Sequence, residues 1–275
     1  MKASYLAPIG IVLLLAACGG SHVRDSGPPS GSVRIPDLPG DPTPRPEPRS
    51  KYGNGPVYEV LGRRYEVMES GAGYRERGVA SWYGNKFHGN LTSNREVYDM
   101  YAMTAAHKTL PLPTYVHVRN LRNNKSIVVR VNDRGPFVHN RIIDLSYAAA
   151  LKLDMIRDGT SLVEVTAIGF DEPGGDRPVR KASPAAPPQP DDQPAAPPNR
   201  VFVQVGAFGE RANAERRLAV LSVAGIGNAF IHEERSPESL LYRVRIGPIR
   251  DVAQYDLIVD ELESIGIADP YLITE

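Results

Sequence analysis

Cysteine is nearly absent from this chain of 275 residues, because Cys18 is its single cysteine. One cysteine excludes an internal disulfide and a zinc site built from several cysteines. A net charge is missing too, since 32 basic side chains balance 32 acidic ones. Without an overall field the chain has no general attraction for nucleic acid or an anionic membrane surface, so we expect no nucleic-acid partner. A neutral polysaccharide or another protein remains open as a ligand.

Long apolar runs are also scarce. The run at residues 11–17 is shorter than the roughly 20 residues of a transmembrane helix. Lys2 precedes this run and small residues end it, which is the order of a secretory signal peptide. Leu15-Ala16-Ala17-Cys18 resembles the lipobox of bacterial lipoproteins, in which the thiol is acylated. Because Gly19 and not Asp follows, the resemblance implies an outer-membrane lipid anchor; the alternative is an ordinary signal peptide with an incidental cysteine.

The 25 prolines and 25 glycines divide the chain into segments of different composition. Residues 18–50 and 171–199 contain too few apolar side chains to build a core, so we predict a disordered tether and a Pro/Ala-rich linker there. The full prediction is a signal peptide at 1–17, the tether at 18–50, a pre-barrel segment at 51–78, a β-barrel at 79–170, the linker at 171–199 and a second domain at 200–275.

Two folds are predicted for the two domains. Short β signals at 79–83, 102–106, 115–121, 126–131, 141–145 and 163–170, with one helix from Ser146 to about residue 153, favour a small, mainly β barrel or sandwich. After the linker, strands at 201–208, 229–233, 241–247 and 271–274 alternate with helices at 211–224 and 252–264. This β-α-β-β-α-β order is typical of a ferredoxin-like α+β domain.

The sheet of the second domain is expected to pack its helices on one face and to leave the other open for a ligand. Phe202 and Gln204 alternate with the valines of the first strand, and Arg243 and Arg245 occupy the polar side of the third. An amide donates to and accepts from sugar hydroxyls, and an aromatic ring covers a pyranose face. These four residues are therefore our candidates for ligand contact, and a general protein-interaction surface is the alternative.

Four ionisable residues of the barrel, Glu96, Asp99, His107 and Asp133, stand near turn signals. Asp133 ends an apolar run, where desolvation raises a carboxyl pKa toward the range of a general acid. It fits equally well as a carboxylate that caps the turn at Arg134. His107 also fits an exposed loop histidine, and Glu96 with Asp99 a solvated charge cluster. No histidine pair has a metal-ligand spacing, so we predict no metal site.

Four ordered segments carry a resemblance to a known family. Gly78-Val79-Ala80-Ser81-Trp82-Tyr83-Gly84, Met100 to His107, and Arg130-Val131-Asn132-Asp133-Arg134-Gly135-Pro136 with Arg141 to Ser146 closely resemble rare lipoprotein A. The resemblance implies a six-stranded double-psi β-barrel joined by a Pro-rich linker to a SPOR domain. It also implies a lytic transglycosylase, which cuts the bond between N-acetylmuramic acid and N-acetylglucosamine without water, leaves a 1,6-anhydro end and uses no cofactor.

The resemblance assigns roles to the candidate residues. It makes Asp133 the acid/base and His107 its partner or a substrate contact, with Glu96 and Asp99 completing the cluster. Phe202, Gln204, Arg243 and Arg245 would bind glycan strands that lack stem peptides, which places the chain at the division septum with divisome proteins as possible partners.

One departure concerns Arg95, where the family has Gly: if the turn needs a positive φ, Arg95 puts the placement of Glu96 in question. A non-catalytic glycan-binding lipoprotein and a barrel hydrolase of the cellulase or expansin type are the alternative readings.

Overall fold

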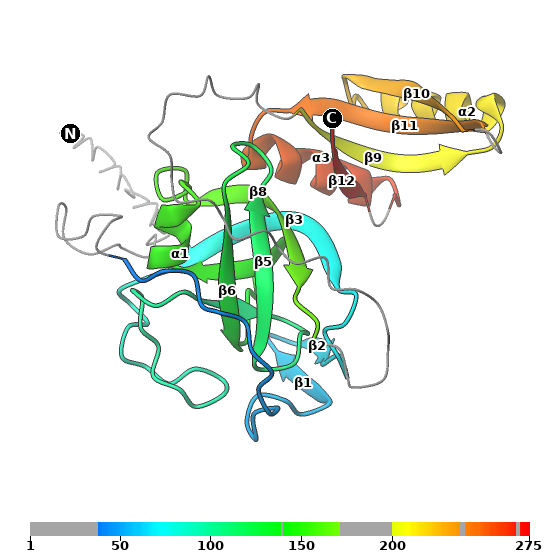
Figure 1. Cartoon of the computed structure of the whole chain (residues 1–275). Helices are drawn as coiled ribbons and strands as arrows, with labels where there is room; N and C mark the ends of the chain where they lie inside the picture. Colours follow the sequence, from blue (N-terminus) through cyan, green and yellow to red (C-terminus); the bar gives the residue numbers. More distant parts are fainter. Residues whose placement is uncertain (1–37, 139, 171–199, 237–239, 268–269) are drawn as a thin grey trace, which may run out of the picture.

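The computed structural model describes residues 38–138, 140–170, 200–236, 240–267 and 270–275 (Figure 1). Cys18, the predicted signal peptide, the first part of the predicted tether and the linker at 171–199 lie outside these residues. In the described ranges, no helix is long and apolar enough to cross a membrane.

Residues 57–66 form a small hairpin of β1 (Val57–Val60) and β2 (Arg63–Glu66), which pair in antiparallel register. Both turn residues, Leu61 and Gly62, have positive φ, which matches the right-handed twist of the flanking strands. The hairpin lies at the edge of the barrel (Figure 1).

The residues before this hairpin lie on the barrel. Those from 38 to 50 belong to the segment that was predicted to be a disordered tether. We call residues 38–56 the docking segment. Asp41 Oδ2 accepts from the Val128 N–H at 2.7 Å, and the Ser50 N–H donates to the Leu112 carbonyl at 2.8 Å. Composition predicted a tether because apolar side chains are few here. The docking depends instead on hydrogen bonds and ion pairs with distant residues.

The closed barrel has six strands, as predicted. They are β3 (Arg75–Tyr83), β4 (Thr104–His107), β5 (Thr114–Asn120), β6 (Ser126–Asp133), β7 (Arg141–Ser146) and β8 (Thr160–Ala167). Their order around the barrel is β3-β7-β4-β6-β5-β8. The β3–β7 and β4–β6 pairs are parallel, and the other pairs are antiparallel. The barrel begins at Arg75, four residues before the predicted boundary.

Alternation along the strands fills the barrel interior. Val116, Val129 and Val131 are fully buried there, because β-branched side chains pack well on a pleated surface. The predicted helix is α1 (Tyr147–Lys152), and Ser146 is its N-cap, whose Oγ accepts from the Ala149 N–H at 3.2 Å. This cap was correctly predicted from the sequence.

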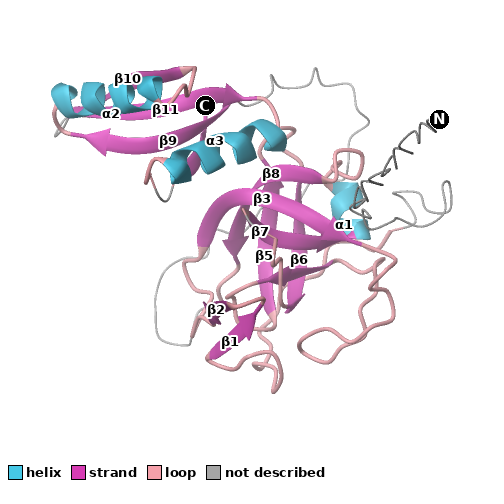
Figure 2. Cartoon of the chain, turned by 180° about the vertical axis from the view of Figure 1, so that it is seen from behind, coloured by secondary structure: helices cyan, strands magenta, loops and turns pink. Residues whose placement is uncertain are grey.

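The C-terminal domain has the predicted ferredoxin-like order. It contains β9 (Val201–Phe208), α2 (Arg211–Val223), β10 (Ala229–Arg235), β11 (Leu240–Ile249), α3 (Val252–Ser264) and β12 (Tyr271–Thr274). The sheet order is β10-β11-β9-β12, and all pairs are antiparallel. Both helices lie on one face of this sheet (Figure 2).

The two domains meet where α3 and β12 approach β3 and β8 (Figure 1). Three barrel side chains, Val79, Leu121 and Leu162, belong to the same apolar cluster as the core of the C-terminal domain. The Arg77 guanidinium also donates to the Leu272 carbonyl at 3.3 Å. Cavities of about 700 and 560 Å³ lie along this junction, and the four candidate residues of the barrel line neither of them.

Candidate active site

Strand register brings two aspartates onto one face of the barrel. Ala106 of β4 pairs with Asp133 of β6 on one side and with Asp144 of β7 on the other, and Asp144 pairs with Ser81 of β3. Residues that pair across strands point to the same side of the sheet. Ala105 belongs to the barrel core, so this row of four residues lies on the outer face. The small side chain of Ala106 leaves the two carboxyls facing a common space.

Asp133 is held rigidly through one of its two oxygens. Oδ1 accepts from the Ser93 N–H at 2.8 Å, from the Ser93 hydroxyl at 2.6 Å and from the Arg134 N–H at 2.7 Å. Within the described residues, Oδ2 has no hydrogen-bond partner. The alternative of a turn-capping carboxylate therefore applies to Oδ1, which caps the turn. Oδ2 is available to a ligand.

Asp144 was not among the candidates from the sequence, although it lies within the quoted motif Arg141 to Ser146. The Ser81 hydroxyl donates to its Oδ1. Burial raises the pKa of Asp144; the bond from Ser81 and the charges of Arg141 and Lys108 oppose this shift, and the negative charge of Asp133 adds to it. A buried carboxyl with a raised pKa beside a second carboxyl is a combination suited to a general acid. Its signal in the sequence was the single acidic residue of β7, flanked by Ile143 and Leu145.

Tyr83 lies close to both aspartates. Its ring stacks on Tyr98 with centroids 4.1 Å apart, and the Tyr98 hydroxyl donates to the Tyr83 carbonyl at 2.5 Å. Burial first, and then the neighbouring Tyr98, Asp133 and Asp144, raise the pKa of Tyr83 well above its ordinary value. The phenol therefore remains a hydrogen-bond donor next to the carboxyl pair.

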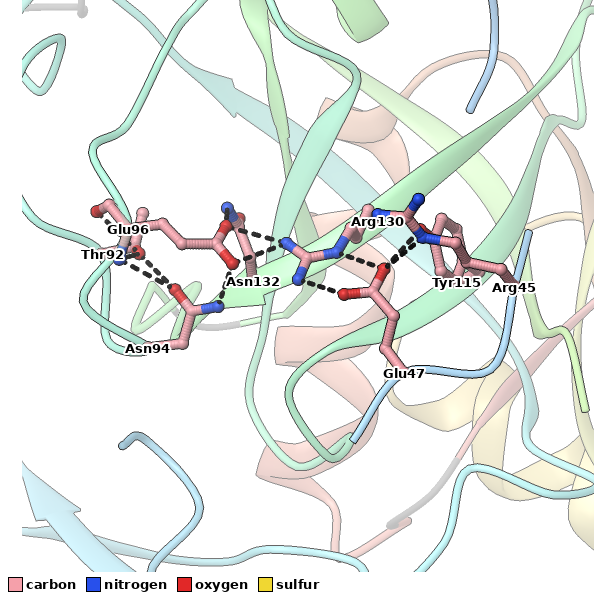
Figure 3. Close-up of polar contacts among 8 residues, drawn as sticks. All are labelled: Arg45, Glu47, Thr92, Asn94, Glu96, Tyr115, Arg130 and Asn132. Carbon is pink, nitrogen blue, oxygen red and sulfur yellow. Dashed lines mark hydrogen bonds and ion pairs between the residues drawn. The ribbon is translucent and has the colours of Figure 1, made fainter. Parts of the chain in front are cut away.

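Glu96 is fixed by a polar network (Figure 3). Arg130 Nη1 donates to both of its carboxylate oxygens at 2.9 and 2.8 Å, the Asn132 amide donates to Oε2 at 2.8 Å, and the Asn94 amide donates to Oε1 at 2.9 Å. Burial by itself would raise the pKa of Glu96, but the hydrogen bonds from Arg130 and Asn132 hold it below its usual value. Glu96 is thus an ionised carboxylate. Its network adjoins Asp133, because Asn132 is the next residue in the chain.

The turn before Glu96 does require a positive φ. Arg95 has φ 73°, a conformation that favours glycine. The turn closes through the Arg95 N–H, which donates to the Thr92 carbonyl at 2.8 Å, and the guanidinium lies 5.5 Å from the ring centroid of Tyr52. A cation over an aromatic ring is attracted to its negative face, which offsets part of the backbone strain. Arg95 therefore adopts the glycine-like conformation in this turn, and Glu96 next to it is held by Arg130, Asn132 and Asn94.

His107 faces away from the aspartates. It follows Ala106 in β4, and successive side chains of a strand point to opposite faces. Its Nδ1 accepts from the Thr109 and Leu110 N–H groups at 3.2 and 3.0 Å, so Nε2 carries the proton and donates to the Tyr74 hydroxyl at 2.7 Å. Burial, with the nearby charges of Arg134 and Lys108, lowers the pKa of His107 to about 3. His107 is buried, so the alternative of an exposed loop histidine is wrong, and this geometry also gives its ring no direct contact with Asp133.

Asp99 stands apart from the other three candidates. Its side chain is exposed, its Oδ1 accepts from the Tyr101 N–H at 2.9 Å, and it lies 3.7 Å from His88 Nδ1. The structure thus sets Asp133 beside the missed Asp144, and the network that holds Glu96 adjoins Asp133 through Asn132. His107 lies on the opposite side of β4 from the two aspartates, and Asp99 lies in an exposed turn away from them. In the described residues, no three His, Cys, Asp or Glu side chains gather as metal ligands would.

The open face of the C-terminal sheet is less accessible than expected. Phe202, Gln204 and Arg245 are only 3%, 2% and 7% exposed. Phe230 packs on Phe202, the Gln204 amide bonds the Tyr271 hydroxyl, and Arg245 pairs with Glu275. Arg243, paired with Glu234, is the most exposed of the four side chains. Three of the four residues are therefore less accessible than an open contact face requires, because the side chains of Phe230, Tyr271 and Glu275 contact them; their role in ligand contact stays a prediction.

Comparison with known proteins first defines the class. A family model described as lytic transglycolase matches residues 75–165, and a SPOR-domain model matches residues 197–274. The chain is therefore a double-psi β-barrel of the lytic transglycosylase type followed by a SPOR domain.

Its curated relatives then define the family. One from Pseudomonas aeruginosa, named endolytic peptidoglycan transglycosylase RlpA, is 38% identical over 295 residues, which cover 92% of this chain and 85% of the relative. A Vibrio cholerae relative of the same name is 50% identical over 175 residues, 62% of this chain and 66% of the relative. The crystal structure of the RlpA SPOR domain from Pseudomonas aeruginosa is 30% identical, and the match covers 26% of this chain and 96% of that one with a TM-score of 0.25. This chain belongs to the RlpA family.

Proposed function

We propose that this chain cuts glycan strands through the Asp133–Asp144 pair, as an endolytic lytic transglycosylase. Family membership makes it a peptidoglycan transglycosylase of the cell envelope that faces the periplasm and binds peptidoglycan. The observation that carries the assignment of residues is the strand register that sets both carboxyls beside Ala106.

The proposed reaction needs one proton donor that later accepts a proton. Asp144 gives its proton to the glycosidic oxygen as the bond from that oxygen to the muramoyl C1 breaks. The same carboxylate then takes the proton of the muramoyl 6-hydroxyl as the O6–C1 bond forms. No water is consumed, and the product is a 1,6-anhydro end. The raised pKa of Asp144 supports this role, because burial favours the protonated form that a proton donor needs.

The neighbouring groups have supporting roles in this proposal. The free Oδ2 of Asp133 and the ionised Glu96 place negative charge where the sugar develops positive charge in the transition state. His107 acts indirectly, because it fixes Tyr74 and the backbone after β4. Asp99, exposed and bound to its own turn, serves as a control position.

The test compares Asp133→Asn, Asp144→Asn and Asp99→Asn, with amidase-treated peptidoglycan as substrate. Mass spectrometry of the products should find anhydro ends with wild type and Asp99→Asn. Asp144→Asn should lower their yield by at least about a thousandfold, as expected for loss of an acid that also serves as the base. An active Asp144→Asn protein refutes this assignment. Reducing ends in place of anhydro ends favour the hydrolase, and sacculus binding without any cleavage favours the glycan-binding lipoprotein.

The proposal extends to where the chain works. We infer an acylated Cys18 in the outer membrane and recruitment by the SPOR domain to septal glycan strands without stem peptides, where divisome proteins are possible partners. The lipobox motif and the SPOR match support this placement. Incorporation of labelled palmitate that survives Cys18→Ala contradicts the lipid anchor. Uniform distribution of a fluorescent fusion over the envelope contradicts septal recruitment.

A further inference from the structure

The docking segment touches three arginines that adjoin the active-site carboxylates. Glu47 pairs with Arg130, the ring of Tyr52 lies under Arg95, and the Gly53 carbonyl accepts from Arg134 Nε at 2.9 Å. Arg130 holds Glu96, Arg95 forms the turn before Glu96, and the Arg134 N–H holds Asp133. The family model begins at residue 75 and does not include this segment.

The contact through Arg130 is the most specific of the three (Figure 3). Arg130 Nε and Nη2 donate to the two oxygens of Glu47 at 3.1 and 2.8 Å, while its Nη1 donates to Glu96. Such a planar fork fixes both the position and the orientation of a guanidinium. The Tyr115 hydroxyl donates to Glu47 Oε1 at 2.5 Å, which holds the carboxylate in turn. The side chains of Glu47 and Arg130 are only 18% and 19% exposed, so solvent screens this pair weakly.

We propose that Glu47 is a positioning residue that orients the active-site carboxylate Glu96 through Arg130, so that the docking segment is part of the catalytic unit. This inference rests on the proposed function, in which Glu96 faces the reacting sugar. Without the two hydrogen bonds to Glu47, the Arg130 guanidinium is free to rotate. The Glu96 carboxylate, which it binds, then shifts from its position. A displacement of this kind lowers turnover and leaves the bound strand largely in place.

The same segment also packs tightly against the turn that holds Asp133. Gly53 has a positive φ of 75°, and a Cβ there would lie 2.9 Å from Leu112 Cδ1 and 3.0 Å from the Ser93 carbonyl oxygen. Ser93 is the residue whose N–H and hydroxyl bind Asp133 Oδ1. The docking segment therefore borders the residues that hold Asp133 and those that hold Glu96.

The experiment uses the full chain with Glu47→Gln, and Asp41→Asn as the matched control. Asp41 also docks this segment, through the Val128 N–H and Lys152, but does not touch Arg130. Glu47→Gln should lower kcat for anhydro-end formation about tenfold with KM within about twofold, as for loss of a charge-assisted hydrogen bond. Asp41→Asn should keep kcat within about twofold of wild type. Tyr115→Phe, which leaves the Glu47 charge in place, should lower kcat by only about two- to threefold.

A double-mutant cycle with Arg130→Gln separates positioning from a general effect on folding. If Glu47 acts through Arg130, Glu47→Gln causes no further loss of kcat in the Arg130→Gln background. An undiminished loss there, or a Glu47→Gln protein with the kcat of Asp41→Asn, overturns the positioning role alone. A wild-type protein that forms no anhydro ends overturns the proposed function, and this role with it. Thermal melting of each variant shows whether the fold is retained.

Discussion

Replacing Ser81 with alanine tests whether Asp144 is the proton donor. The Ser81 hydroxyl donates to Asp144 Oδ1 and stabilises the charged form of that carboxyl against the effect of burial. Ser81 is itself buried, and alanine removes the hydroxyl with little change in volume. The perturbation therefore acts on the ionisation of Asp144 and leaves its place in β7 unchanged.

The size of the effect follows from the hydrogen bond. A bond to a charged group contributes about 1.5–3 kcal/mol, and a difference of about 1.4 kcal/mol between protonation states corresponds to one pKa unit. Loss of the donor makes ionisation less favourable, so the pKa of Asp144 rises further. An acid with a higher pKa keeps its proton to a higher pH. The descending limb of the kcat/KM profile should therefore move up by about 1 to 2 pH units.

The assay measures anhydro-end formation from amidase-treated strands between about pH 4 and pH 10. Ser93→Ala is the control, because it removes the Ser93 hydroxyl from Asp133 and should leave the descending limb in place. A Ser81→Ala profile whose descending limb coincides with that of wild type, or lies at lower pH, refutes Asp144 as the acid. If the descending limb moves in Ser93→Ala and not in Ser81→Ala, Asp133 is the general acid.

Two predictions concern stability and its pH dependence. Burial by itself would raise the pKa of Glu164, but hydrogen bonds from Arg77 and Arg75 hold it at about 2. Its contribution, on the order of 2–3 kcal/mol, is therefore present above about pH 4.5 and is lost as the pH falls toward 2. Urea unfolding should find Glu164→Gln less stable than wild type at pH 7 and equal to it near pH 2; a difference independent of pH contradicts the ion pairs as its cause. His107→Ala should cost about 2–4 kcal/mol of stability without removing a limb of the activity profile between pH 5 and 8, because the wild-type ring stays neutral there. A limb in that range that vanishes with His107 would show that the ring titrates during catalysis.

Some features of the molecule could be predicted from local patterns alone. The strand Val201–Phe208 and the helix Val252–Ser264 begin and end where alternation and helical spacing placed them. Ser146 caps α1 because a hydroxyl before a run of helix formers accepts from a free N–H three residues later. A positive φ at residue 95 was considered because the family has glycine there, and Arg95 does have a positive φ. Each of these depends on a few consecutive residues, so the chain carries the information locally.

The active site depends on contacts between distant parts of the chain. Asp133 and Asp144 become neighbours only because β4 lies between β6 and β7 in the barrel, and strand order is set by long-range pairing that no short pattern encodes. The direction of His107 depends on the register of the same strand. Glu47 forms an ion pair with Arg130, which lies 83 positions away in the chain. The composition of the segment around Glu47 predicts only a solvated tether. Local residue patterns specify which elements form and which acids are present. The packing of the barrel specifies which of these acids meet, because a shared site needs contacts between residues far apart in the chain.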